Sequence, residues 1–114
     1  MMFIVNPRAG VETASTEKAL FEEIETLRTN QVTPGELQKA KNLLLTELFR
    51  EMKTIAGRAN LIGLYDIYKG DYRKLFTAQA EIEAVTAADV LRVAKQYLSP
   101  LNRTVATLIP EKAQ

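Results

Sequence analysis

VTPGEL, at residues 32–37, carries the clearest structural signal in the chain. Thr33 suits the N-cap of a helix, Pro34 suits the first helical position, and Glu36 can return a hydrogen bond to the cap. The apolar residues at the two ends of the stretch stand where a hydrophobic staple closes. VTAADV, at residues 85–90, repeats the pattern with an aspartate in place of the capping glutamate. Both stretches predict helix starts.

Apolar residues spaced three and four apart predict helices on either side of these two starts. We expect five helices, over residues 13–28, from 33 to about 55, 58–69, 71–83 and 86–98. The expected inward residues, in helix order, are Leu20, Ile24 and Leu27; Leu37, Ala40, Leu44, Leu48, Met52 and Ile55; Leu61, Leu64, Tyr65 and Tyr68; Tyr72, Leu75, Ile82 and Val85; and Val90, Ala94, Tyr97 and Leu98. Gly57 is expected at a break or a close packing point, and Gly70 at a helix C-cap.

A short β-prone run lies at each end of the helical part. Phe3–Val5 and Thr104–Ile109 are rich in β-branched and apolar residues and predict a first and a last strand. We therefore expect an α+β fold, with a tail at 111–114. Two strands alone make a marginal sheet, so residues 1–114 are expected to be a single incomplete domain whose other strands precede Met1.

Composition excludes several classes of function. The chain has no His and no Cys, which removes imidazole and thiolate metal ligands, Ser–His relays and cysteine nucleophiles. Fifteen basic residues balance fourteen acidic ones, so no strong field favours nucleic acid. The longest aliphatic run is residues 43–45, far below the roughly 20 residues that span a bilayer. We expect no nucleic-acid partner and no membrane span.

Four groups of side chains are candidate sites, and for each an ordinary structural role is favoured. The groups are an acidic cluster at Glu22, Glu23 and Glu25; a polar and basic stripe at Lys39, Asn42, Thr46, Arg50 and Lys53; the tyrosines Tyr65, Tyr68 and Tyr72; and the pair Glu47 and Glu51. Adjacent acids on one helix diverge rather than converge on a cation. We therefore assign no catalytic, cofactor-binding or metal-binding residue.

The order of the helix starts and endings resembles the pitrilysin/insulinase family of zinc metallopeptidases, which includes mitochondrial processing peptidase. The resemblance lies in VTPGELQKAKN at 32–42, in 85–90 continuing to Tyr97 and Leu98, and in 102–105 and 108–110; residues 57–59 and Gly70 also match comparable positions. It extends from about Phe3 to Lys112.

The resemblance implies a non-catalytic, C-terminal segment of a two-layer α/β domain that completes a peptide-holding chamber. Active members hold zinc through H-x-x-E-H and a further Glu, and this chain has no His to match. Zinc is therefore expected only in an upstream domain or a partner subunit. The implied partners are a homologous catalytic domain or subunit and a peptide substrate.

Two other functions stay open. The same fold serves elsewhere as a structural subunit without peptidase activity, and a small enzyme that uses carboxylates or Lys is the least favoured class. Self-association is left open. The compartment is also open, with the periplasm favoured over the cytoplasm and mitochondria.

Overall fold

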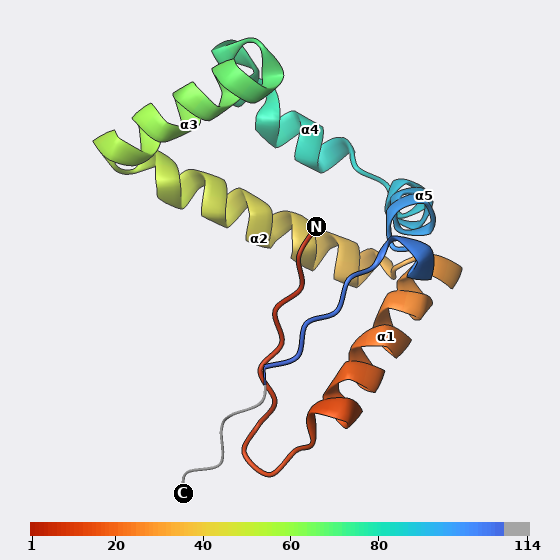
Figure 1. Ribbon diagram of the computed structural model, residues 1–114. Coiled ribbons are helices and arrows are strands. Elements are labelled where there is room, and N and C mark those ends of the chain that lie inside the picture. Colours follow the sequence, from red (N-terminus) through yellow and green to blue (C-terminus); the bar gives the residue numbers. More distant parts are fainter. Residues whose placement is uncertain (109–114) are drawn as a thin grey trace, which may run out of the picture. The chain divides into compact units, whose positions relative to one another are not determined.

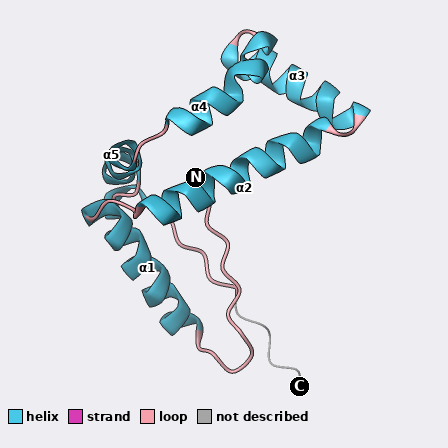
Figure 2. Cartoon of the chain, turned by 180° about the vertical axis from the view of Figure 1, so that it is seen from behind, coloured by secondary structure: helices cyan, strands magenta, loops and turns pink. Residues whose placement is uncertain are grey.

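All the regular secondary structure in the part of the chain that the structure describes is helical. A computed structural model gives residues 1–108, and the elements follow one another as helices joined by loops (Figures 1 and 2). They are α1 (Thr13–Thr29), α2 (Pro34–Met52), α3 (Ile55–Lys69), the 3₁₀-helix η1 (Tyr72–Thr77), α4 (Ala78–Ala84), α5 (Ala87–Tyr97) and the 3₁₀-helix η2 (Pro100–Asn102). The prediction of five helices is confirmed, and the prediction of an α+β fold is wrong.

The two expected strands do not form. Residues 3–5 and 104–108 have no regular secondary structure, and no backbone hydrogen bond joins the two segments. Both segments are exposed, with Ile4 at 75% and Leu108 at 96%. A β-branched run becomes a strand only when a neighbouring strand takes its N–H and C=O groups, and residues 1–108 supply none. Ile109 and the tail at 111–114 lie outside the described residues.

Contacts group the chain into two units. Among the described residues, one unit holds 1–31 together with 90–108, and the other holds Val32–Asp89. In the second unit α3 packs against α2 and η1, and α4 packs against α2 and η1. The chain therefore runs out along α2, turns into α3, and comes back through η1 and α4 to α2 (Figure 1).

Both predicted helix starts are confirmed by their hydrogen bonds. Thr33 Oγ1 accepts from the Glu36 N–H at 3.3 Å, while Glu36 Oε2 accepts from the Thr33 N–H at 2.8 Å. Thr86 and Asp89 make the same reciprocal pair, with N–H donors at 3.2 and 3.1 Å from the side-chain oxygens. Each pair satisfies N–H groups that have no partner inside the helix. Residue chemistry alone therefore fixes where α2 and α5 begin.

Gly57 marks a close packing point, as expected, but the helix break comes before it. α2 ends at Met52, and Thr54 caps α3 by accepting from the Gly57 N–H at 2.9 Å. A Cβ built on Gly57 would overlap the carbonyl oxygen of Glu51. Only a residue without a side chain lets the last turn of α2 lie this close to the first turn of α3.

The expected helix over 71–83 is two elements rather than one. Asp71 caps it as expected, accepting from the Arg73 N–H at 2.9 Å, but its first part is 3₁₀ and only Ala78–Ala84 is α-helical. Leu75 and Ala78 are buried, 4% and 2% exposed. Leu75 lies in η1 and Ala78 begins α4, but the Ala78 N–H donates to the Leu75 carbonyl, so a 3₁₀ turn joins the two residues and places both on the packed side. The preceding α3 ends as predicted at Gly70, whose φ is 71°.

The inward face of α2 is rotated from the expected seam. Leu37, Leu48 and Met52 are half-buried as predicted, but Ala40, Leu44 and Ile55 are exposed. Lys41 and Leu45 take the half-buried places instead. Lys41 Nζ donates to the carbonyl oxygen of Glu83 at 2.7 Å, which brings that face toward α4. The aliphatic stem of a lysine can occupy such a place while its charge bonds at the edge.

The remaining faces of the second unit are also less buried than predicted. Leu61, Leu75 and Ala78 are its buried apolar residues. Tyr65 and Ile82 are half-buried, whereas Leu64, Tyr68, Tyr72 and Val85 are exposed. These helices therefore bury one narrow line of side chains and leave the flanking ones in water.

The first unit confirms the expected stripe of α1. Ile24 is buried, and Leu20 and Leu27 are half-buried. Phe21 packs beneath Arg103, whose guanidinium carbon lies 3.7 Å from the ring centroid. That distance is typical of a cation–π contact.

α5 follows its predicted face with one exception. Ala94 is buried and Val90 and Leu98 are half-buried, but Tyr97 is 54% exposed, so its expected inward position is wrong. The helix ends before Ser99, as expected, and Ser99 Oγ then caps η2 by accepting from the Leu101 N–H at 3.3 Å.

Substitution of Gly57 by Ala tests the close junction between α2 and α3. Because the new Cβ would overlap a backbone oxygen, we expect Gly57→Ala to lower the free energy of unfolding by about 1–3 kcal/mol. Gly63→Ala is the matched control, because a Cβ there meets nothing within 4 Å and Ala favours a helix interior. Urea unfolding followed by circular dichroism measures both, and a Gly57→Ala chain as stable as the control would contradict the packing described.

Candidate interaction surface

Large apolar side chains stand outward on α3 and η1, and we call them the α3 surface. They are Ile55, Ile62, Ile67, Tyr68 and Phe76, with exposed fractions of 81%, 41%, 77%, 79% and 69%. Helical spacing places Ile55 and Ile62 on one side of α3 and Ile67 and Tyr68 on other sides, so α3 is exposed and apolar around its circumference rather than along one patch. This surface is the strongest candidate for function in the described chain.

The acidic cluster on α1 is solvated rather than assembled into a site. Glu22, Glu23 and Glu25 are all exposed. Glu25 pairs with Arg28 one turn along the helix, and Glu22 lies 3.9 Å from Lys18. Nowhere in residues 1–108 do three or more acidic side chains gather closely enough to hold a metal ion.

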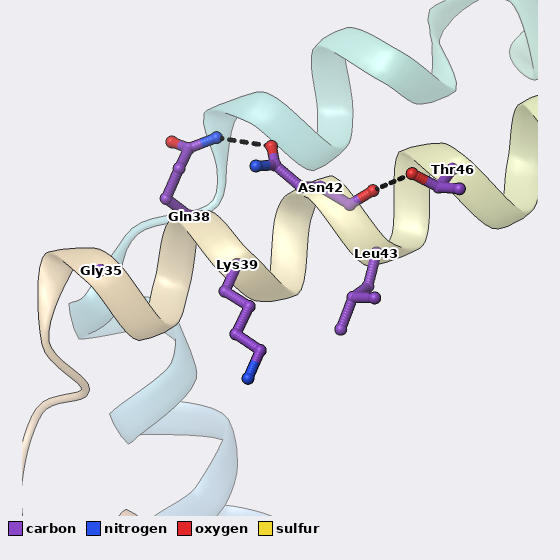
Figure 3. A pocket seen from close by; sticks show the side chains of 6 residues that line it. All are labelled: Gly35, Gln38, Lys39, Asn42, Leu43 and Thr46. Carbon is purple, nitrogen blue, oxygen red and sulfur yellow. Dashed lines mark hydrogen bonds between the residues drawn. The ribbon is translucent and has the colours of Figure 1, made fainter.

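The basic stripe lies on the exposed back of α2, beside a shallow depression. Gln38, Lys39, Asn42 and Thr46 line the depression together with Gly35 and Leu43, around a volume of about 460 Å³ (Figure 3). Gln38 Nε2 donates to Asn42 Oδ1 at 3.0 Å, and Thr46 Oγ1 donates to the Asn42 carbonyl at 2.7 Å. A single helix supplies all the walls, so the depression cannot enclose a ligand as binding sites do.

The charged residues Glu47, Arg50, Glu51 and Lys53 near the end of α2 are also exposed. Arg50 Nη1 donates to Glu47 Oε1 at 2.9 Å, so this cation is already paired within its own helix. Lys53 and Glu51 are exposed at the end of α2. A carboxylate that pairs with an arginine in water is not arranged for acid–base chemistry.

The three tyrosines differ in their exposure. Tyr65 is half-buried, Tyr68 is 79% exposed, and Tyr72 is 41% exposed with Arg73 at 5.7 Å from its ring centroid. Tyr68 instead belongs with the isoleucines of the α3 surface. Its ring offers contact area at a low entropic cost to a covering partner.

Sequence reasoning missed most of the α3 surface. Ile62 and Ile67 lie outside the predicted stripe of α3, and Phe76 was assigned no role. A signal was present, because α3 carries apolar residues on every side of its helix and only three charged residues, Arg58, Asp66 and Lys69. Such a pattern predicts a helix that is covered on more than one side.

Comparison with known proteins assigns no family. No protein-family model matches the chain, and no solved structure matches it. In the described residues no helix is long and apolar enough to cross a membrane.

The carboxyl of Glu36 is held by a helix cap, and its pKa is lowered. The Thr33 N–H donates to the Glu36 carboxylate, and the Thr33 hydroxyl adds a second hydrogen bond at 2.8 Å. These two bonds hold the pKa of Glu36 below its ordinary value of 4.5. The carboxylate therefore serves the start of α2.

Acid should weaken the start of α2 through Glu36. Because its pKa is lowered in the folded chain, its contribution to stability is present above 4.5 and is lost as the pH falls through the folded value. We expect Glu36→Gln to keep an acceptor for the Thr33 N–H while removing this part of the acid sensitivity. Urea unfolding at a series of acid pH values compares the two chains, and NMR follows the Glu36 carboxyl directly. The cap's role would be contradicted if the stability of the variant fell with acid as steeply as that of the wild-type chain, or if the Glu36 carboxyl titrated at 4.5 or above.

Proposed function

We propose that this chain is a non-catalytic segment of a pitrilysin/insulinase-type zinc metallopeptidase, in its C-terminal part, and that it packs against the homologous catalytic domain or subunit. It would act as part of the wall that keeps a peptide substrate in the chamber. The proposal concerns a helical segment and involves no sheet within residues 1–108.

The observation that carries the proposal is the α3 surface. Ile67 and Phe76 are each more than two-thirds exposed, so their burial against another domain would be favourable by roughly 1.5–3 kcal/mol per fully covered side chain. The resemblance adds to this through the order and spacing of its stretches, two of which contain the reciprocal caps that begin α2 and α5.

Zinc does not fit the residues of this chain. The sequence has no His or Cys, and residues 1–108 bring no three acidic side chains together. Under the proposal, therefore, this chain holds no metal and performs no chemical step. Its residues bind and position the domain that does.

The experiment captures the protein from its source cells with an antibody raised against this chain, under native conditions. We expect the captured material to contain zinc, to include a polypeptide with an H-x-x-E-H motif, either on the same chain or on a partner, and to cleave a fluorogenic peptide in a chelator-sensitive way. Phe76→Asp in the expressed protein should reduce recovery of the activity, while Leu43→Asp, a similarly exposed apolar position on the back of α2, should not.

The outcomes separate the proposal from its alternative. Zinc with chelator-sensitive cleavage supports the peptidase segment. A stable complex without zinc or peptidase activity contradicts it and favours the structural or interaction subunit. A bare 12.8 kDa polypeptide without zinc contradicts it as well.

A further inference from the structure

One face of α3 carries opposite charges placed symmetrically about an apolar residue. Arg58 lies four residues before Ile62, and Asp66 lies four residues after it. Residues four apart share a face of a helix, each offset by about 40° from the next. Ile62 is therefore flanked by a cation toward the N-terminus of α3 and by an anion toward its C-terminus.

All three side chains are available to another molecule. Arg58 and Asp66 are exposed, and Ile62 is 41% exposed. Neither charged side chain makes an ion pair or a hydrogen bond within residues 1–108. Arg58 and Asp66 therefore have no charged partner within the described chain.

The order of the two charges along α3 makes this face complementary to a second α3 that runs in the opposite direction. If a second α3 lies antiparallel, with a two-fold axis at Ile62, each Arg58 faces the Asp66 of the other copy and the two Ile62 side chains meet. A parallel pair would instead place Arg58 against Arg58 and Asp66 against Asp66. A surface that is complementary to itself is the requirement of a two-fold symmetric dimer.

We propose that this face of α3 binds the α3 of a second copy of this chain, antiparallel and centred on Ile62. The same symmetry brings Ile55, which is 81% exposed, opposite Lys69 of the other copy, where the aliphatic stem of the lysine covers it. A single helix of 15 residues offers less area than a standard interface, so the dimer is weak and depends on concentration. This inference does not rest on the proposed function, because it concerns self-association of the chain alone.

Charge reversal tests the proposal by sedimentation velocity of the full chain over a range of concentrations. We expect Arg58→Asp and Asp66→Arg each to weaken the dimer about tenfold or more, because each variant makes two like-charge contacts. An equal mixture of the two variants should recover the dimer, since every charge then faces its opposite. Both changes place charges favourably for the helix dipole, so the variants should keep their helix content.

Two results overturn the proposal. One is a wild-type chain that stays monomeric at every concentration. The other is a mixture of Arg58→Asp with Asp66→Arg that associates no better than the separate variants. Weakening by each single variant supports antiparallel pairing, because in a parallel pair like charges already face each other in the wild-type chain. Recovery in the mixture shows that the charges at positions 58 and 66 are the cause, because general stickiness of the α3 surface would not depend on which two variants are combined.

A cysteine cross-link supplies a second readout, because the chain has no Cys of its own. Ile62→Cys places the two thiols on the proposed two-fold axis, within the short separation that a disulfide needs. We expect rapid covalent dimerisation under mild oxidation, whereas Leu43→Cys, 60% exposed on α2, should cross-link much more slowly. Equal rates for the two variants would overturn the proposed centre of the interface.

Discussion

Scarce burial is the constraint on which the rest of this structure depends. Among residues 1–108 the buried apolar side chains are Ile24, Leu61, Leu75, Ala78 and Ala94, and two of them are alanines. So small a core adds little hydrophobic stabilisation to any one helix. Hydrogen bonds at the helix ends are therefore important for the stability of the helices. The reciprocal pairs Thr33–Glu36 and Thr86–Asp89 are examples.

Features set by neighbouring residues could be predicted from the sequence. The start of α2 at Pro34, the C-cap at Gly70 and the inward stripe of α1 all follow from residue type and spacing within one or two turns. Features that need a distant partner could not. Residues 104–108 have strand-like chemistry, but a strand requires a neighbour, and the sequence alone does not show whether one is present.

The same distinction explains the α3 surface. A helical period identifies an apolar face but cannot say how much of it the rest of the chain covers, so Tyr68 and Leu64 were expected inside and lie outside. The seam of α2 shows the effect more finely, because the hydrogen bond from Lys41 to the Glu83 carbonyl turns one polar residue inward in place of Ala40. The chain leaves many apolar side chains exposed and buries few. Both features favour association with another molecule.

Amide hydrogen exchange measured by NMR on the full chain tests the central claim, which is that local helical hydrogen bonds hold residues 1–108 without a sheet. The account predicts protected amides inside α2 and α3, and exchange close to that of an unstructured peptide at residues 3–5 and 104–108. Protected amides in both of these end segments, together with cross-strand contacts between them, would contradict it.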